Sequence, residues 1–284
     1  MRDIKRHIRG VKSIEHITNA MKLVSAAKLS RAKAVFEKTQ EYMHYVTDSI
    51  NEIFNNVDEI PGHYLLGDRE IKRTCYIVVT SNRGLAGSFN MNVIKAALRE
   101  MEDDKGKPLL VCVGAKGRDY FAKRDFEIFS EYLSPPESVT FVDTGKISKP
   151  VVALFDEGEI DEVIIFYTAF LSSLSQRVQQ KRLLPFETEP NPEAVHGGKQ
   201  IDYEPSPDEV FNYLVPKYVE IMVYQAIVES ATCEHAARRI AMENATENAR
   251  DMISDLELYY NRARQAAITK EITEIVSGAD AVNG

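Results

Sequence analysis

Glycine and proline are distributed so unevenly along this chain that they constrain its fold more than any other feature. Of the 14 glycines and 11 prolines, 21 fall between residues 61 and 207. Residues 11–60 and 217–277 contain neither. Helices of those lengths would extend roughly 75 and 90 Å at about 1.5 Å per residue, whereas most globular helices run about 8 to 20 residues. The sequence therefore predicts two terminal helices that are too long to fold inside one compact domain.

The first long segment carries apolar residues at coiled-coil spacing. Apolar residues recur at steps of three and four in two runs, one that starts at Ile14 and one that starts at Met43. The apolar spacing is interrupted between residues 28 and 38. We expect one face of this helix to be buried against another helix. The predicted seam of the first run consists of Ile14, Ile17, Met21 and Val24.

The second long segment begins with a helix-capping signal. Ser206 is the expected N-cap, Pro207 the first helical residue and Glu209 the partner three positions after the cap. Pro216 is expected to kink the early part, and Gly278 to end the helix. In between, small and medium apolar residues form a face that allows close helix approach: Ala231, Ala236, Ala237, Ala241, Ala245, Ala249, Met252, Leu256, Tyr260, Ala263 and Ala267.

The two ends of the chain carry opposite charge, although the whole chain has a formal charge of −8. Residues 1–40 hold 10 Lys/Arg and 3 Asp/Glu, and residues 205–284 hold 7 and 13. Opposite charges favour pairing of the two helices with each other, and a single middle domain makes an antiparallel hairpin the economical solution. The alternative is a bundle in which each arm breaks into shorter helices, but no turn signal marks such breaks.

The middle of the chain alternates between strand and helix patterns, which is typical of a small parallel α/β sheet. The expected strands are residues 74–81, 108–114, 126–129 and 161–170, followed by a strand toward 178–186. The expected helices are residues 91–102 and 115–124. The fold class is therefore α/β plus coiled coil with a Rossmann-like middle domain, divided into residues 1–60, 61–205 and 206–284.

No segment of the sequence has the pattern of an active site. Gly84 and Gly87 follow the first strand, but neither phosphate-binding fingerprint is complete, which favours a structural turn. The acidic residues 156–162 are typical of a solvated turn, with cation binding as the alternative. His16 and His235 are expected to serve packing or hydrogen bonding between helices, and the three cysteines are too far apart for a zinc site. We expect no catalytic residue, cofactor or metal.

Three stretches carry a resemblance to a known family: residues 17–33 (ITNAMKLVSAAKLSRAK), 80–90 (TSNRGLAGSFN) and 260–282 (YNRARQAAITKEITEIVSGADAV). They resemble the signature stretches of the gamma subunit of F-type ATP synthases, in order over the whole chain. The resemblance implies a non-catalytic rotor shaft that couples proton-driven rotation of the c ring to ATP synthesis and hydrolysis. Its implied partners are the alpha and beta subunits, the epsilon subunit and the c ring, at the cytoplasmic face of the cell membrane.

The resemblance also implies residue roles. The matching positions for the contact with a beta-subunit loop, known as the catch, are Arg238, Arg264, Gln265, Thr269 and, near that loop, Met21. Tyr203 and Glu204 match the stretch that rests on the c ring. We add the hypothesis that the basic arm, with Lys28, Arg31 and Lys33, faces acidic loops of the beta subunits.

Several residues depart from the family pattern. Lys270 stands where many members have Gln, Asn82 replaces a common Asp, and Ala86 stands where some members have Cys. The absence of a cleavable targeting pattern favours a bacterial source.

Two other classes of protein remain as alternatives, an α/β enzyme with helical dimerisation arms and a nucleic-acid-binding coiled coil. The first needs an active site, and the second needs a basic patch on a chain whose pI is about 5.4.

Overall fold

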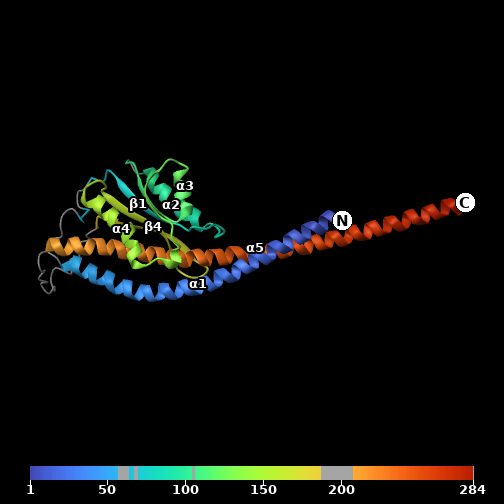
Figure 1. Ribbon diagram of the computed structural model, residues 1–284, viewed down its shortest axis with the longest axis horizontal. Helices are drawn as coiled ribbons and strands as arrows, with labels where there is room; N and C mark the ends of the chain where they lie inside the picture. The colour runs from blue at the N-terminus through green and yellow to red at the C-terminus, as the bar shows by residue number, and fades with distance from the viewer. Residues whose placement is uncertain (57–63, 67–69, 104–105, 187–206, 284) are drawn as a thin grey trace. The chain divides into compact units, whose positions relative to one another are not determined.

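The computed structural model describes residues 1–56, 64–66, 70–103, 106–186 and 207–283. By its contacts the chain divides into two compact units, a terminal unit of Met1–Ser25 with Arg238–Gly284 and an α/β unit of Ala26–Ala237. The elements can be followed in Figure 1. In chain order they are α1 (Arg2–Asn56), β1 (Thr74–Val79), α2 (Phe89–Asp103), β2 (Leu109–Val113), α3 (Ala115–Ala122), β3 (Glu127–Tyr132), the short 3-10 helix η2 (Pro136–Ser138), α4 (Phe141–Asp156), β4 (Glu162–Phe170), β5 (Gln176–Leu184) and α5 (Pro207–Asn283).

The α/β unit contains one five-stranded sheet in the order β3-β2-β1-β4-β5. The first four strands in this order are mutually parallel, as the alternating pattern predicts. The fifth strand, β5, pairs antiparallel with β4, so the sheet is mixed. The prediction of a parallel sheet was therefore correct for four strands and wrong for β5. The reason is the short connection: residues 171–175 can form a hairpin but cannot cross over to a parallel neighbour.

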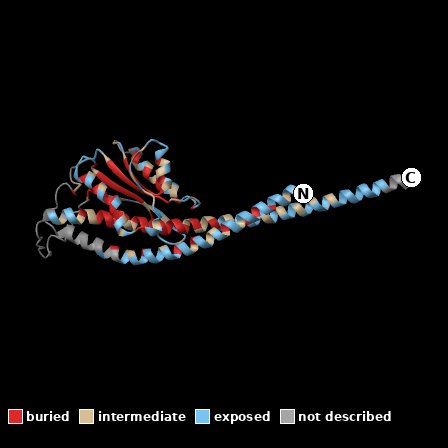
Figure 2. Cartoon of the chain, in the orientation of Figure 1, coloured by how far each residue is buried: buried red, intermediate tan, exposed pale blue. Residues whose placement is uncertain are grey.

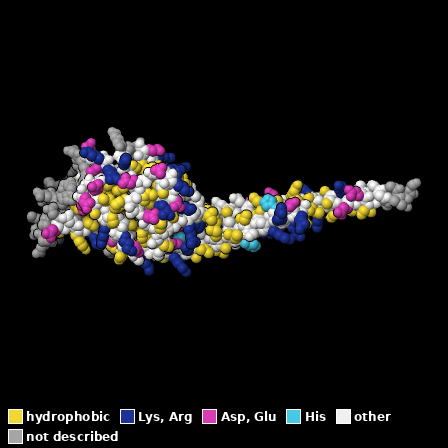
Figure 3. All heavy atoms as spheres, turned by 45° about the horizontal axis from the view of Figure 1, so that its top comes forward, with side chains coloured by type: hydrophobic (Ala, Val, Ile, Leu, Met, Phe, Trp, Pro, Cys, Tyr) yellow, Lys and Arg dark blue, Asp and Glu magenta, His cyan; other side chains and the backbone are white. Residues whose placement is uncertain are grey.

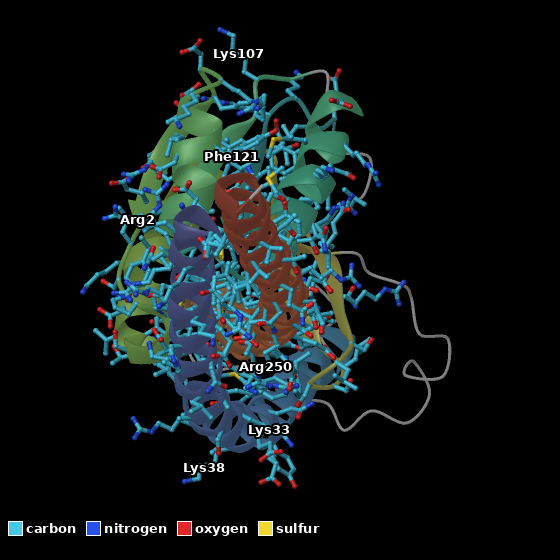
Figure 4. All side chains as sticks on the ribbon, turned by 90° about the vertical axis from the view of Figure 1, so that its right-hand side faces the viewer. Arg2, Lys33, Lys38, Lys107, Phe121 and Arg250 are labelled. Atoms are coloured by element: carbon cyan, nitrogen blue, oxygen red, sulfur yellow. The ribbon has the colours of Figure 1, made fainter. Side chains whose placement is uncertain are left out.

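Helices cover both faces of the sheet. On one face α2 and α3 pack against side chains such as Tyr76 and Val78 of β1, and Phe121 of α3 is completely buried there (Figure 4). On the other face α4 and α5 pack against Ile77 and its neighbours, and Phe36 of α1 joins the same core. Figure 2 shows the resulting burial along the strands. A parallel strand that is buried on both faces reads as a continuous apolar run, which is why β1 was recognisable.

Helix α4 was missing from the sequence-based assignment. Thr140 is its N-cap and accepts a hydrogen bond from the backbone N–H of Asp143, whose side chain accepts one from the N–H of Thr140. This reciprocal pair is a capping box with Asp in place of Glu or Gln. Pro150 and Gly145 inside the helix weaken its helical signal in the sequence. The helix nevertheless buries Val151 and Phe155 against the sheet, so packing decides its formation.

In the terminal unit, the buried or half-buried residues of α1 are not the predicted ones. Ile14, Ile17 and Val24 are 53–57% exposed, so the predicted seam is wrong except at the half-buried Met21. The inward positions also step by three and four residues, but many of them are polar: Ile4, Ile8, Val11, Glu15, Thr18, Lys22 and Ser25. The spacing goes on without a slip in the α/β unit, at Leu29, Ala32, Phe36, Thr39 and Met43.

Polar contacts between α1 and α5 set an antiparallel register in the terminal unit. The hydroxyl of Thr246 donates to that of Thr18 over 2.8 Å, and both side chains are buried. Further along, Lys12 Nζ lies 2.7 Å from Glu257 Oε1, and Lys22 Nζ lies 4.0 Å from Glu243 Oε1. The charge order is reversed in one pair, where Arg250 Nε lies 3.0 Å from Glu15 Oε1. In these pairs the residue number increases along α1 while it decreases along α5. This order confirms the predicted antiparallel pairing.

The alanine-rich face of α5 is largely as predicted, with two differences near its end. Met252 is 49% exposed and its neighbour Ile253 takes the inward position. Helix α5 also continues past Gly278 to Asn283, so the predicted stop was wrong. It begins at Pro207 as expected, although the cap Ser206 lies outside the described residues.

Both long helices are unbroken within their bounds, which excludes the alternative of a bundle of shorter helices. The three-part division of the chain stays a prediction.

Candidate functional site

The predicted beta-subunit contacts fall in two separate places on α5. Arg264, Gln265 and Thr269 are exposed near its end. Arg238 is only 9% exposed and makes further interactions inside the protein. At about 1.5 Å per residue, Arg238 and Arg264 are roughly 39 Å apart along the helix. The structure therefore does not join the predicted catch residues into one patch.

Met21 lies at the level of Arg238 and not of Arg264. The next residue, Lys22, contacts Glu243 of α5 at 4.0 Å, and Glu243 also pairs with Arg239 at 3.2 Å. This register places Met21 within about two helical turns of Arg238 along the axis. A surface that includes both residues is thus compatible with the fold, whereas one that joins Met21 to Thr269 is not.

The three predicted basic-arm residues have different environments in the α/β unit. Lys28 Nζ lies 2.7 Å from Glu137 Oε1 in η2, and Lys33 pairs with Glu37 on the same helix at 3.4 Å. Lys33 is labelled on α1 in Figure 4. Within the described part of the chain, Arg31 is exposed and makes no ion pair. Of the three basic-arm residues, Arg31 is therefore the one whose charge is not matched by a carboxylate among the described residues.

Glu137 connects three elements of the α/β unit. Besides Lys28 of α1, it contacts His235 of α5, whose Nε2 lies 3.1 Å from Glu137 Oε1. Burial alone would raise the pKa of Glu137, but the hydrogen bond from Lys28, a backbone hydrogen bond and the nearby His235 together lower it. A cavity of about 410 Å³ lies beside this contact, with apolar walls that include Val35, Val139 and Val228. The predicted structural role of His235 agrees with this position.

The end of α5 exposes large apolar side chains. Ile268, Ile272 and Ile275 are 47%, 56% and 71% exposed and follow one another by four and three residues. The register set by Glu15 and Arg250 brings Met1 opposite about residue 264, so α1 does not extend along these last turns. An apolar stripe of this kind marks a surface that interacts with another molecule. Exposed hydrophobic side chains of the helices are visible in Figure 3.

Comparison with known proteins identifies the chain's relatives. A family model described as ATP synthase matches residues 1–282. The ATP synthase gamma chain of Alkaliphilus metalliredigens is 45% identical over 99% of this chain and 98% of its own length. That of Moorella thermoacetica is 41% identical over 99% of each chain.

This chain belongs to the gamma-chain family of ATP synthase. A gamma chain is the central stalk of the rotor and a non-catalytic subunit of the membrane-bound enzyme, whose catalytic sites lie on the beta subunits. Within the described residues, no helix is long and apolar enough to cross a membrane. The predicted family, function class and fold are thereby confirmed.

Solved structures share the fold of this gamma chain. The rotor of the Euglena gracilis mitochondrial ATP synthase matches with a TM-score of 0.68 at 18% identity, over 94% of this chain and 98% of the other. The central stalk and c-ring structure from Tetrahymena thermophila matches with a TM-score of 0.60 at 23% identity, over 81% and 99%. At these identities the likeness shows a shared fold.

The glycine-containing turn of this gamma chain, residues 81–90, is fixed by its own side chains. Asn90 accepts a hydrogen bond from the backbone N–H of Ser81, and Asn82 accepts one from the N–H of Ala115 at the start of α3. Gly87 has a φ of 57°, a conformation that suits glycine. Ala86 and Phe89 pack against Cys233 of α5. The turn therefore joins the sheet, α3 and α5, which agrees with the structural interpretation and explains why Asn can replace Asp at position 82.

The acidic segment has a structural role. Asp161 accepts hydrogen bonds from the backbone N–H groups of Lys72 and Arg73, and Glu162 is buried against Arg182. The interhelical role predicted for His16 was wrong, because its side chain is 80% exposed and its Nδ1 lies 3.8 Å from Glu15 of the same helix. The described residues contain no cluster of three or more His, Cys, Asp or Glu that could hold a metal ion. The predicted c-ring contacts, Tyr203 and Glu204, lie outside the described residues.

Sequence reasoning missed two features of the candidate surfaces. The first is the outward apolar stripe of α1, because Ile14, Ile17 and Val24 were assigned to the seam. The second is Glu137, which had no sequence signal because its partners Lys28 and His235 are about 100 residues away on either side. The hydrogen bond between Thr18 and Thr246 and the ion pair between Lys12 and Glu257 could be recognised only after the two helices had been aligned.

Proposed function

We propose that this chain turns as a shaft inside a ring of three alpha and three beta subunits, driven by proton flow through a c ring at the cytoplasmic face of the membrane. The asymmetric surface of the shaft contacts the three beta subunits differently at each angle. Differential contact is required because a surface that bound all beta conformations equally would shift none of them. The beta subunits then pass in turn through binding, synthesis and release of ATP.

The observation that carries this proposal is the exposed apolar end of α5. Ile268, Ile272 and Ile275 lie on turns that α1 does not cover. Burying one such side chain is worth about 1.5–3 kcal/mol, which this chain does not gain alone. An apolar sleeve formed by other subunits would supply that burial. Small residues on the preceding turns, Ala263 and Ala267, keep the helix narrow enough to rotate.

The outward stripe of α1 supports the same arrangement. Ile14, Ile17 and Val24 are spaced by three and seven residues and thus share one helix face. A neighbouring face of α1 pairs with α5 through Thr18 and Glu15. Helix α1 therefore offers a second seam that suits a further subunit, such as an apolar loop of the ring.

For the catch we propose one contact, at the end of α5, that does not include Arg238. Exposed Arg264, Gln265 and Thr269 suit hydrogen bonds to a beta-subunit loop, and the guanidinium of Arg264 can bind a carboxylate through two parallel bonds. Arg238 is mostly buried, so we assign it to positioning the coiled coil beside Met21. Lys270 pairs with Glu274 at 3.6 Å and is not needed for the contact.

The basic-arm hypothesis is sharpened by the ion pairs of Lys28 and Lys33. Because these two lysines already have partners in Glu137 and Glu37, Arg31 is the residue that we expect to face an acidic loop of a beta subunit. Reversing Lys28, Arg31 and Lys33 to Glu together should weaken assembly in a salt-dependent way. The single change Arg31→Glu should give most of that effect, and equal loss from Lys33→Glu alone would contradict the assignment.

At the other end, we propose that Tyr203 and Glu204 contact the c ring and that the α/β unit binds the epsilon subunit. The gamma chain of Acetobacterium woodii, 40% identical to this chain, is named as sodium ion specific. The transported ion is selected by membrane subunits, so the shaft role is the same for protons and for sodium.

Co-expression with alpha and beta subunits tests the proposal. The variant Ile272→Asp places a charge in the exposed apolar stripe, and Asn261→Asp adds the same charge at an exposed polar position of the same helix. We expect Ile272→Asp to lower recovery of the alpha–beta–gamma complex at least about tenfold, the effect of roughly 1.4 kcal/mol. Asn261→Asp should leave recovery nearly unchanged. Equal recovery of both variants would show that the stripe is not buried in the complex.

A further inference from the structure

A second cavity lies within the α/β unit, away from the surfaces described above. Its volume is about 500 Å³, and its walls come from α1, β4, β5 and α5. Ligand cavities of small proteins are usually about 300–1,000 Å³. The side chains that line this cavity are more polar than those beside Glu137, and they include one ammonium group.

That ammonium group belongs to Lys181 of β5. The side chain is half-buried, and its Nζ is close to the Met222 sulfur, at 3.8 Å, with no carboxylate within ion-pair distance in the described part of the chain. Its neighbour Arg182 is different, because its guanidinium is matched by the buried carboxylate of Glu162. Burial lowers the pKa of Lys181. A thioether is a weak acceptor, so the lysine charge is poorly compensated.

Three further side chains in the walls can donate hydrogen bonds. Gln40 of α1 and Gln225 of α5 carry amide N–H groups. Tyr167 of β4 carries a hydroxyl, and burial together with the nearby Glu229 and Cys233 raises its pKa to about 12. The hydroxyl is therefore protonated at neutral pH and remains a donor. One negative charge opposes this set, the carboxylate of Glu41.

We propose that this cavity binds a small oxyanion, held by a charge-assisted hydrogen bond from Lys181 and by hydrogen bonds from Gln40, Gln225 and Tyr167. Charge-assisted hydrogen bonds are about twice as strong as neutral ones. A cation that loses water without gaining a counter-ion is destabilising, and a bound anion removes that penalty. Glu41 weakens the binding through like-charge repulsion. The bound anion joins both long helices to the sheet at one point, which stiffens this end of the α/β unit.

The plain alternative is that water alone fills the cavity and solvates Lys181. The two interpretations differ in one measurable respect, because only a bound anion can protect the amine in a saturable way. Lys123 at the end of α3 is an exposed lysine outside the cavity and serves as the internal reference.

The test is site-resolved acetylation of the full chain by acetic anhydride at constant pH, read by mass spectrometry. Inorganic phosphate is the probe, with chloride added to hold ionic strength constant. At saturating phosphate we expect acetylation of Lys181 to slow by at least about threefold relative to Lys123, as one-site occupancy requires. An equal effect of phosphate on both lysines would overturn the proposal.

Two variants give opposite expected signs in the same assay. Glu41→Gln removes the opposing charge and should lower the phosphate concentration needed for half protection. Gln225→Leu removes a donor and should raise it. If both variants left the concentration unchanged, the anion would not lie in this cavity. Circular dichroism of each variant checks that the fold is intact, so loss of structure is distinguished from loss of binding.

Discussion

The α/β unit and the terminal unit bury different kinds of side chain. In the α/β unit the central strands β1, β2 and β4 are mostly apolar and buried, as at Ile77 and Ile165, whereas the edge strands β3 and β5 are more polar and partly exposed. In the terminal unit the reverse arrangement is common: Thr18 and Thr246 lie inside the helix pair, while Ile17 and Ile272 lie outside. The α/β unit thus buries most of its apolar side chains in its own core. The terminal unit leaves part of its apolar surface exposed and available to other subunits.

This difference suits the two roles that we assign to the units. A polar seam fixes the register of two helices because each ion pair or hydroxyl pair has one correct partner. The apolar side chains are then available for the surrounding sleeve. We infer that the stability of the terminal unit depends on assembly, whereas the α/β unit is stabilised by its own core.

The largest effect is expected in the core of the α/β unit. Ile77 in the central strand β1 is completely buried, so Ile77→Ala should lower the free energy of unfolding by about 2–5 kcal/mol through lost burial and a cavity. Val142→Ala is the matched control, because Val142 is 75% exposed. Chemical denaturation of the full chain measures both. A loss below about 1 kcal/mol for Ile77→Ala would contradict the closed-core description.

A smaller effect is expected from the polar seam. Thr246→Val removes the hydroxyl contact with Thr18 and should lower the free energy of unfolding by about 1 kcal/mol. The double change Thr18→Val with Thr246→Val replaces both partners by apolar groups and should be nearly neutral. A double-mutant cycle in denaturant measures the coupling. Strictly additive losses would show that the two hydroxyls do not interact.

An acid-sensitive contribution is expected in the α/β unit at the start of α4. Hydrogen bonds from Lys146 and Thr140 lower the pKa of Asp143 to about 2. Because the folded pKa lies below the unfolded value of 3.8, the carboxylate stabilises the fold at higher pH, and this contribution is lost as the pH falls from about 4 to about 2. Stability measured against pH should lose this component in Asp143→Asn. An unchanged profile would argue against the capping box.

The smallest effect on stability is expected on the outward stripe of α1. Ile17→Ser changes a 57% exposed residue and should alter the free energy of unfolding of the chain alone by no more than about 0.5 kcal/mol. The same variant should lower recovery of the complex with alpha and beta subunits. If Ile17→Ser destabilised the chain alone as much as Ile77→Ala, the distinction between the two units would fail.

The sequence was sufficient for the architecture but not for the helix interface. Long segments without glycine or proline and a continuous apolar strand such as β1 are strong local signals, and both were interpreted correctly. The seam of α1 was misassigned because Ile14 and Ile17 have the right spacing and apolar character, and nothing local shows that Glu15 and Thr18 find partners on α5. Helix α4 was missed because packing of Phe155 outweighs the weak propensity of its sequence.

The candidate surfaces were predictable only in part. Exposure of Arg264 and Gln265 follows the family resemblance, but burial of Arg238 does not. The partner of Lys28 is about 110 residues away at Glu137. The position of Lys181 beside the Met222 sulfur depends on four elements meeting around one cavity. Such relations exist only in the folded chain, because they join residues with no common sequence pattern.

Single-molecule rotation tests the central claim most directly. The chain is assembled with alpha and beta subunits, a bead is attached to an exposed residue of the α/β unit, and the bead is followed during ATP hydrolysis. The account predicts rotation in one direction with three main steps per turn, and little torque from Ile272→Asp in any complex that still forms. A stationary bead in an assembled, ATP-hydrolysing complex would contradict the role of this chain as the shaft.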